Sequence, residues 1–439
     1  MKAAFYTLGC KVNQYEGQVL AQRFAAAGFE PVPWPGPAGV YVVNSCTVTQ
    51  QSEKKAAQLL RRLRREHPDA LLVLCGCWPQ AFPGAAAASG ADVVAGTARD
   101  RLPQLVRQAL QTGEQVVEII PHHSKEPFEP MQATAMEGHT RAFVKIEDGC
   151  DRFCSYCIIP HARGRVRSKP LADLKQEVEF LAGQGFCEIV LTGINLSSYG
   201  KGEGFTLLDG VKTAAAVPSI RRVRLGSLEP DLTDDALLEG LSRVAKFCPQ
   251  FHLSVQSGCN ATLARMNRRY TAEQYLDLCR RIRERFSCPA VTTDLMVGFA
   301  GETEEEFAQT LAFVQAAGFA AVHVFPYSRR PGTRADAMEG QIEESVKARR
   351  AQRAAALAEA GRRQFLQAMA GRVEPVLFER CGLPGKGRGH TPNGSLVMVE
   401  TSRNLRGTIL PVRITGTDPG GHCLGELLEP EFEAPTAHQ

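Results

Sequence analysis

Short apolar runs alternate with helical stretches along most of this chain, and this alternation is the strongest constraint on its fold. A strand-length run, a helix and a further run together indicate a βαβ unit with parallel strands. Three such runs lie at residues 3–8, 40–43 and 70–74, with helical patterns at 15–27 and 52–66 between them. Six more lie at 142–146, 188–191, 223–225, 252–255, 291–297 and 321–325. We therefore predict an α/β protein, with an N-terminal parallel-sheet domain at 1–120 and a partial (β/α)6 barrel at 139–370.

Three cysteines, Cys150, Cys154 and Cys157, follow the first strand of the predicted barrel in the spacing CxxxCxxC. Thiolates hold iron–sulfur clusters, and a four-iron cluster held by three cysteines leaves one iron open to a small molecule. The alternative is zinc, which usually takes four ligands from paired CxxC-type units. The nearest further cysteine, Cys187, begins a predicted strand and forms no such pair. The spacing therefore favours a cluster whose open iron is the reactive site.

A cysteine also follows each of the three N-terminal runs, at Cys10, Cys46 and Cys77. The carboxyl ends of parallel strands share one edge of a sheet, where open α/β sheets bind ligands. The three thiols are therefore expected to meet there as a second three-cysteine cluster site. The alternative is that they are structural, because cysteine is among the residue types most often buried. Cys75, within the third run, is interpreted as a buried strand residue.

Composition narrows the class of protein. The chain has 439 residues, of which 44% are hydrophobic, and its 14 cysteines are too dilute for a disulfide scaffold. No run approaches the roughly 20 apolar residues of a membrane span, and the N-terminus lacks a secretory pattern. We expect a cytoplasmic protein with no membrane partner. Arginine clusters at 61–65 and 280–285 permit an anionic partner such as RNA, although a solvated helix face is the better explanation of any single cluster.

Two further segments differ from the α/β regions. Residues 121–138 are polar, carry no periodicity and predict a linker, in which His122 and His123 are expected to be solvated. Runs at 373–378, 395–400 and 408–415, joined by glycine-rich turns, predict a small β-barrel at 372–439. Its candidate phosphate contacts are basic: Lys386, Arg388, Arg403, Arg406 and Arg413.

Seven segments carry recognisable motifs: 7–16, 43–49, 76–80, 157–164, 252–259, 265–271 and 323–333. Together with the CxxxCxxC loop they resemble the radical S-adenosylmethionine (SAM) methylthiotransferase family. Two departures are Trp78-Pro79, where tyrosine-alanine is more usual, and Ala300, which replaces a common proline. The C-terminal barrel is similar in position and length to the TRAM domain, an RNA-binding β-barrel of that family.

The resemblance implies cofactors and their ligands. Cys10, Cys46 and Cys77 would hold an auxiliary [4Fe-4S] cluster, and the CxxxCxxC cysteines a second [4Fe-4S] cluster whose open iron takes SAM. Further SAM contacts carried over from the family are Gly193 and Asn195 near the amino group, Ser227, Glu229 and Gln256 near the ribose and carboxylate, and Gly298 and Tyr156 near the adenine. Arg163, Arg165 and Arg167 would touch substrate phosphate or cover the barrel rim.

The resemblance also implies the reaction. It is greatest to the enzymes that convert N-threonylcarbamoyladenosine, next to the tRNA anticodon, to its 2-methylthio derivative with two SAM molecules. The expected partners are the tRNA anticodon stem-loop and an electron donor such as flavodoxin or ferredoxin. Sister enzymes that act on isopentenyladenosine in tRNA, or on an aspartate of a ribosomal protein, remain alternatives. A non-catalytic RNA-binding or electron-transfer iron–sulfur protein is an alternative of a different class.

Overall fold

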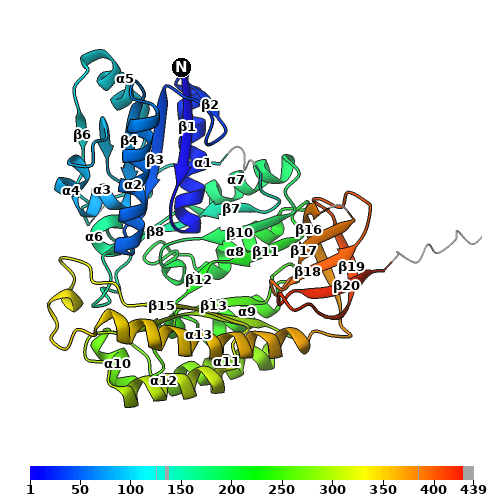
Figure 1. The fold of residues 1–439 in the computed structure, drawn as a ribbon. Coiled ribbons are helices and arrows are strands. Elements are labelled where there is room, and N and C mark those ends of the chain that lie inside the picture. The colour runs from blue at the N-terminus through cyan, green and yellow to red at the C-terminus, as the bar shows by residue number, and fades with distance from the viewer. Residues whose placement is uncertain (125, 134–137, 384, 429–439) are drawn as a thin grey trace, which may run out of the picture.

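The computed structural model describes residues 1–124, 126–133, 138–383 and 385–428. Three regions built on β-sheets follow one another along the chain (Figure 1). The N-terminal sheet region and the C-terminal barrel contact different sides of a central α/β region. The α/β fold predicted from the sequence, with a small β-barrel at its end, is confirmed.

The N-terminal region is a six-stranded sheet in the order β2-β1-β3-β4-β5-β6, in which every neighbouring pair is parallel. Its strands are β1 (Lys2–Thr7), β2 (Glu30–Val32), β3 (Val40–Ser45), β4 (Leu71–Gly76), β5 (Val93–Ala95) and β6 (Val116–Glu118). The apolar runs predicted β1, β3 and β4. The other three strands have only three residues each, too few to give a periodic pattern.

Helices cover both faces of this sheet and bury its apolar side chains. On one face, α1 (Lys11–Ala26) and α5 (Leu102–Thr112) pack on residues of β3 such as Val40 and Val42. On the other face, α2 (Gln50–Glu66), α3 (Cys77–Ala81) and α4 (Pro83–Ala87) pack on Tyr41 and Val43. Alternate residues of β3 thus face opposite cores, which explains its uninterrupted apolar sequence.

The central region is an open barrel of two parallel sheets, in the orders β11-β10-β7 and β12-β13-β14-β15. Its main strands are β7 (Ala142–Lys145), β10 (Glu188–Thr192), β11 (Arg222–Leu225), β12 (Ser227–Leu228), β13 (Gln250–Leu253), β14 (Ala290–Val297) and β15 (Ala321–Pro326). The strand predicted at 223–225 is β11, and the predicted loop after it contains a further short strand, β12. β11 pairs with one sheet and β12 with the other. A two-stranded antiparallel pair, β8 (Glu147–Asp148) with β9 (Arg167–Ser168), follows β7.

Helices lie outside these strands, and their apolar faces form the largest core of the molecule. They are α7 (Leu171–Gly183), α8 (Leu207–Ala216), α9 (Asp235–Ser242), α10 (Asn260–Arg265), α11 (Ala272–Arg285), α12 (Glu304–Ala317) and α13 (Glu344–Gln367). The short helix α6 (Ile159–Arg163) instead packs on α3 of the N-terminal region. Short 3-10 turns lie at Leu196–Ser198, Pro230–Leu232 and Arg334–Ala337. The strand-then-helix order leaves the loops after the strands at one end of the barrel.

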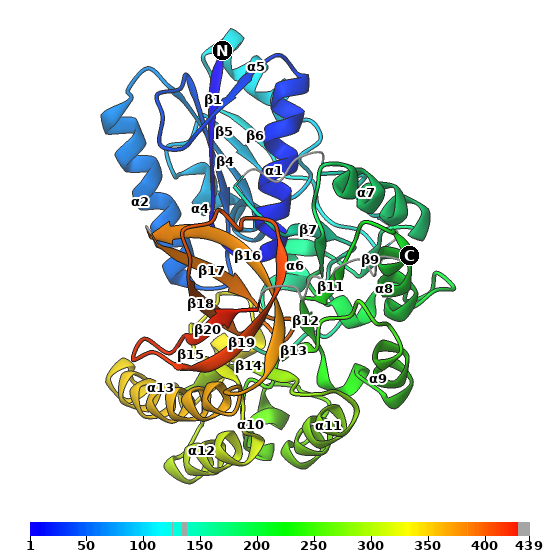
Figure 2. The ribbon, with the colours of Figure 1, turned by 90° about the vertical axis from the view of Figure 1, so that its right-hand side faces the viewer.

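The C-terminal region is a closed five-stranded barrel in the order β16-β17-β18-β20-β19. Its strands are β16 (Val373–Leu383), β17 (Lys386–His390), β18 (Leu396–Glu400), β19 (Ile409–Thr417) and β20 (Cys423–Leu427). Figure 2, in which this barrel faces the viewer, shows it against the central region. Two buried arginines of β11 hold it there: Arg222 donates to the carbonyl oxygen of His390 at 3.0 Å, and Arg224 to that of Pro392 at 2.9 Å.

The N-terminal region contacts both open edges of the central barrel, at its first and its last strand. Beside β7, Tyr15 of α1 donates to Glu177 of α7 at 2.8 Å. Beyond β15, Arg330 donates to the hydroxyl of Thr47 at 3.0 Å and pairs with Glu53 of α2. The first and last strands of the barrel are therefore bridged through one and the same neighbouring region.

The predicted linker is only partly solvated. His123 is exposed, as expected, but the expectation for His122 is wrong. Its ring pairs with Glu126 at 2.7 Å and lies 3.0 Å from the hydroxyl of Thr97 and 3.2 Å from the carbonyl oxygen of Ala162. Elsewhere, no helix among the described residues is long and apolar enough to cross a membrane.

Candidate active site between two groups of cysteines

The CxxxCxxC loop leaves β8 through Gly149, whose φ of +84° is in the left-handed region. A Cβ atom at this position would lie 1.9 Å from the carbonyl oxygen of Arg165, so only glycine fits. The loop then tightens, because the amide of Cys157 donates to the carbonyl oxygen of Cys154 at 3.0 Å. Arg268 donates to the Cys154 sulfur at 3.2 Å. Burial, followed by the charge of Cys154, raises the pKa of Cys157 to about 12.

The N-terminal cysteines follow β1, β3 and β4, and the structure brings them together at one edge of the sheet. A Cβ atom on Gly9, beside Cys10, would lie 2.8 Å from Cβ of Cys46. Burial raises the pKa of Cys46 to about 12, with further contributions from the neighbouring charges of Cys77 and Cys10. Cys75, by contrast, is buried within β4, as interpreted from the sequence.

Both groups have the donor chemistry that an iron–sulfur cluster needs. Each offers three thiols, and in each group one sulfur also receives a guanidinium hydrogen bond: Cys77 from Arg163 at 3.1 Å and Cys154 from Arg268 at 3.2 Å. In the described part of the chain, no three His, Cys, Asp or Glu side chains converge as ligands of a single ion. Thiolates that bind different irons of one cluster need no such convergence. The residues present therefore fit clusters.

Two hollows lie between the N-terminal region and the barrel, and each is lined by one cysteine of one group. One, of about 310 Å³, is lined by Cys10 together with the predicted SAM contacts Gly193 and Ser227. The other, of about 150 Å³, is lined by Cys157, Tyr156 and Gln256 from the barrel and by Val48 and Thr49 from the N-terminal region. Both hollows are thus shared between the two regions.

Three buried acceptor oxygens near these hollows have no hydrogen-bond partner among the described residues: Glu147 Oε1, Asn195 Oδ1 and Gln256 Oε1. An unsatisfied buried acceptor is costly, and a ligand with several donors would satisfy it. Glu147 also accepts from the backbone amide of Asn195 at 2.7 Å, which places these two residues side by side. An ammonium group such as that of SAM carries several donors and suits this pair of residues.

Two residues predicted to contact SAM, Glu229 and Gly298, make close contacts with other protein groups. The carboxylate of Glu229 pairs with Arg268 at 2.7 Å. Gly298 has a φ of +69°, and a Cβ atom there would lie 2.4 Å from Cγ of Lys347. Its amide donates to Glu302 at 2.7 Å. These contacts give Glu229 and Gly298 structural reasons to be present.

The sequence analysis missed an aspartate of the barrel interior. Asp294 on β14 lies 3.3 Å from Nε2 of His252 and 3.4 Å from Nδ1 of His323. Burial alone would raise the pKa of Asp294, but the hydrogen bond and charge of His252, followed by those of His323, lower it. Asp294 lines the same hollow as Cys157. A charged residue within an otherwise uncharged strand was the available signal.

The prediction for the three arginines after the CxxxCxxC loop is wrong for two of them. Arg163 is completely buried and contacts Cys77 and Glu16. Arg167 is buried and pairs with Glu126 at 2.8 Å. Neither can reach a substrate phosphate, because protein groups enclose both guanidinium groups. Arg165 is more than half exposed and stacks on Phe153 with its Cζ atom 4.8 Å from the ring centre.

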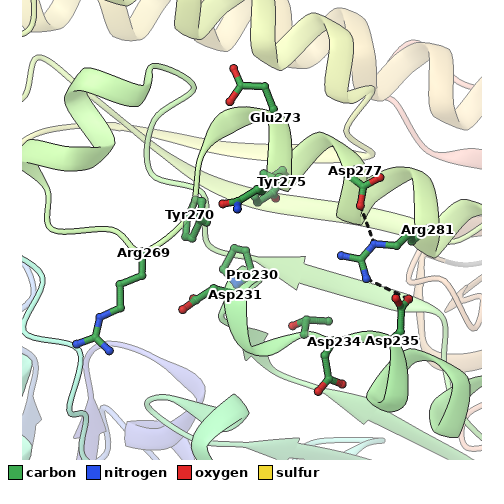
Figure 3. A pocket seen from close by; sticks show the side chains of 12 residues that line it. Pro230, Asp231, Asp234, Asp235, Arg269, Tyr270, Glu273, Tyr275, Asp277 and Arg281 are labelled. Atoms are coloured by element: carbon green, nitrogen blue, oxygen red, sulfur yellow. Dashed lines mark hydrogen bonds and ion pairs between the residues drawn. The ribbon is translucent and has the colours of Figure 1, made fainter.

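A larger hollow, of about 680 Å³, lies between α9 and α11 (Figure 3). Its walls are mainly charged, and Arg281 spans it to pair with Asp277 and Asp235 at 2.9 and 3.1 Å. No cysteine lines this hollow. Its floor nevertheless reaches the CxxxCxxC loop, because Asp231 pairs with Arg152 at 2.6 Å.

The five basic residues predicted to contact phosphate on the C-terminal barrel are all exposed: Lys386, Arg388, Arg403, Arg406 and Arg413. Lys386 and Arg388 lie on β17, and Arg413 on β19. The pleat alternates buried and exposed residues along both strands, which puts these side chains on the outside of the barrel.

Comparisons with known proteins agree with this architecture. The model of the radical SAM superfamily matches residues 144–314, and that of the Uncharacterized protein family UPF0004 matches residues 2–96. Among solved structures, the radical SAM methyltransferase TsrM from Kitasatospora setae, with cobalamin and a [4Fe-4S] cluster bound, has a TM-score of 0.56. The aligned part covers 76% of this chain and 74% of the TsrM chain. The sequence identity is 17%, so this likeness concerns the fold alone.

Two curated relatives match almost from end to end. The threonylcarbamoyladenosine tRNA methylthiotransferase MtaB of Bacillus subtilis is 36% identical over 94% of this chain and 93% of its own. The tRNA-2-methylthio-N(6)-dimethylallyladenosine synthase of Symbiobacterium thermophilum is also 36% identical, over 96% and 93%. With matches of this extent, and a radical SAM barrel preceded by a sheet that gathers three further cysteines, the chain belongs to the radical SAM tRNA methylthiotransferases.

Proposed function

We propose that this protein converts N-threonylcarbamoyladenosine next to the tRNA anticodon to its 2-methylthio derivative. The observation that carries the proposal is that a cysteine of each group shares a hollow with residues of the other region. Cys10 shares one hollow with Gly193 and Ser227 of the barrel, and Cys157 shares the other with Val48 and Thr49 of the N-terminal region. A reaction that needs both a radical and a sulfur donor requires two such centres side by side.

Radical SAM membership implies SAM and a [4Fe-4S] cluster, and the relatives imply a tRNA substrate. A cluster with an open iron supplies the electron that cleaves SAM reductively, and this gives a radical able to attack an unactivated C–H bond. We assign that cluster to Cys150, Cys154 and Cys157. We assign a second, sulfur-handling [4Fe-4S] cluster to Cys10, Cys46 and Cys77.

The side chains around these cysteines would bind and orient the reactants. Glu147 and Asn195 offer buried acceptors that suit an amino group, and Gln256 offers another in the hollow lined by Cys157. Tyr156 lies edge-on to Phe299, with ring centres 6.5 Å apart, and forms an apolar wall suited to a purine. Enclosure between the barrel and the N-terminal region would exclude water from a reactive radical.

Further parts of the proposal concern partners and organisation. The anticodon stem-loop would lie across the shared hollows, with its backbone reaching the exposed basic residues of the C-terminal barrel. The electron donor would be a small protein such as flavodoxin or ferredoxin, and the setting the cytoplasm. The domains would divide at residues 1–120, 139–370 and 372–439, with a linker at 121–138.

Nucleoside analysis of tRNA from a deletion strain tests the substrate. We expect 2-methylthio-N-threonylcarbamoyladenosine to disappear and its unmodified precursor to accumulate. Loss of the 2-methylthio form of isopentenyladenosine instead would assign the chain to the type of the Symbiobacterium relative. If both modified nucleosides persist, a ribosomal protein aspartate becomes the candidate.

Two measurements on purified protein test the chemistry. Anaerobic incubation with SAM and a reductant should yield 5′-deoxyadenosine, whereas its absence would favour a non-catalytic iron–sulfur protein. Iron analysis tests the second cluster, because replacing Cys10, Cys46 and Cys77 by alanine should remove about half of the iron. Unchanged iron content would leave a single cluster.

A further inference from the structure

Arg163 connects the two cysteine groups. It is the last residue of α6, the short helix that begins two residues after Cys157. Its guanidinium group is completely buried, and its Nε donates to the sulfur of Cys77 in the N-terminal region at 3.1 Å. A residue carried by one cysteine loop thus holds a sulfur of the other group.

All parts of this guanidinium group are engaged. Besides the bond from Nε to Cys77, Nη2 donates to Glu16 at 2.9 Å and also to Asn13, and Nη1 donates to Glu16 and Asp148. Because the guanidinium is planar and its fork is fixed from several sides, the direction of the Nε–H bond toward Cys77 is fixed too. The sulfur is therefore held by a preorganised donor.

Buried charged groups surround Arg163, the donor to the Cys77 sulfur. A buried charge cluster, defined here as Glu16, Arg99, Lys145, Asp148 and Arg163, contains three cations and two carboxylates. Lys145 contacts Glu16 at 2.7 Å, and Arg99 contacts it at 3.1 Å.

Around this cluster, Arg167 pairs with Glu126 and also lies 3.4 Å from Asp148, and Arg23 pairs with Glu129. Burial raises the pKa of Glu147 well above its usual range, so its carboxyl group adds no charge. One positive charge in the buried charge cluster is therefore in excess among the described residues. A buried charge needs a partner, and the Cys77 sulfur, which accepts the hydrogen bond from Nε of Arg163, lies beside this excess charge.

We propose that Arg163 is a positioning residue that fixes the Cys77 sulfur and raises the reduction potential of the cluster bound by Cys10, Cys46 and Cys77. A reduced cluster carries one more negative charge than an oxidised one, so a nearby cation and a hydrogen bond to a ligand sulfur favour the reduced form. This inference rests on the auxiliary cluster of the proposed function. It adds that the loop of one cluster sets the potential of the other.

The test uses full-length protein in which Cys150, Cys154 and Cys157 are replaced by alanine, so that only the auxiliary cluster remains. Arg163→Met, Arg163→Lys and the matched control Arg165→Met are each added to this background. Iron per chain is measured first, and the midpoint potential is then determined by a redox titration followed by electron paramagnetic resonance. Arg165 is a suitable control because its guanidinium is more than half exposed and pairs with Asp151.

We expect Arg163→Met to make the potential more negative. A tenfold loss of preference for the reduced form corresponds to a shift of about 59 mV for a one-electron couple. Arg163→Lys should shift it less, because lysine keeps the charge but cannot reproduce the fork. Arg165→Met should leave it unchanged.

An unchanged potential in Arg163→Met with iron retained would overturn the inference. If that variant binds no iron, Arg163→Lys decides: a more negative potential supports the inference, and an unchanged one overturns it. A background variant that binds no iron would instead refute the auxiliary cluster itself. Failure of the proposed function is thereby distinguished from failure of the role of Arg163.

Discussion

Replacing Glu16 by glutamine removes one negative charge from the buried charge cluster and leaves the side-chain volume almost unchanged. Glu16 is completely buried and contacts three cations, Arg163, Arg99 and Lys145. Burial alone would raise its pKa, but the three cations outweigh burial and lower the pKa from 4.5 to about 2. Since one pKa unit is worth about 1.36 kcal/mol, the charged form contributes about 3 kcal/mol at neutral pH.

The general cost of breaking a buried ion pair leads to a similar loss of unfolding free energy. Removing one partner from a buried ion pair typically costs about 3–5 kcal/mol, because the remaining charges stay buried without compensation. We therefore expect Glu16→Gln to lower the unfolding free energy by about 3 kcal/mol or more. The matched control is Glu66→Gln on α2, where half-exposed Glu66 lies 3.8 Å from Arg62, and its cost should be about 0–1 kcal/mol.

Tryptophan fluorescence is well placed to measure this loss. The chain has two tryptophans, Trp34 and Trp78, and both lie in the N-terminal region that contains Glu16. Urea unfolding of the metal-free full-length protein, followed by fluorescence, gives the free energy as the midpoint multiplied by the slope. A Glu16→Gln midpoint equal to that of Glu66→Gln at pH 7 would refute the reasoning.

The pH dependence provides an independent check of sign. The pKa of Glu16 is lower in the folded state, so its contribution is complete above its ordinary pKa of 4.5 and is lost as pH falls toward 2. The difference between wild type and Glu16→Gln should therefore be constant from pH 7 to about 5 and shrink below that. A difference that grows on acidification would contradict the assigned sign.

Three more predictions concern other parts of the molecule. Gly149→Ala should lose about half of the bound iron, because a positive φ costs alanine about 1–2 kcal/mol and the new Cβ atom would also lie 1.9 Å from the carbonyl oxygen of Arg165. Iron analysis checks this prediction. The control is Gly183→Ala, where an added Cβ atom meets open space, and an equal loss of iron in that variant would contradict the reasoning. Arg224→Met should speed amide hydrogen exchange in β17 and β18, because Arg224 holds the C-terminal barrel against the central region. The control is Arg221→Met, which replaces an exposed residue and should leave the exchange rate unchanged. Equal exchange rates in the two variants would count against the role of Arg224 in docking the barrel. The affinity for tRNA should fall steeply with salt, and replacing Lys386, Arg388 and Arg413 by glutamine should reduce the log–log slope by about 2–3; an unchanged slope would exclude these residues as phosphate contacts.

The sequence predicted those features that local patterns encode. Strand periodicity and the position of each cysteine after a run sufficed to place Cys10, Cys46 and Cys77 at one sheet edge, because parallel strands have one polarity. The small barrel followed from its turns, although β17 and β20 were missed. Three-residue strands such as β5 carry no period and form only because a longer neighbour supplies the pairing.

The long-range partners of charged residues could not be predicted. Arg163, in a polar stretch after the CxxxCxxC loop, was interpreted as a surface residue, but its partner Glu16 lies 147 positions away. Glu229 pairs with Arg268, 39 positions away, and this partner could not be predicted either; its contact with SAM stays a prediction. Charge alone does not tell a solvated arginine from a buried one, since the difference depends on which carboxylates the fold brings close.

The bridge beyond β15 has a consequence for the kinetics of folding. Arg330 and Thr47 are separated by 283 positions, so their contact can form only after nearly the whole barrel has been synthesised and its chain entropy lost. Contacts that form this late are absent from the folding transition state and act mainly on the rate of unfolding. The bridge would thus slow the opening of the cleft between the two regions. The lifetime of the closed form then matters as much as its equilibrium stability.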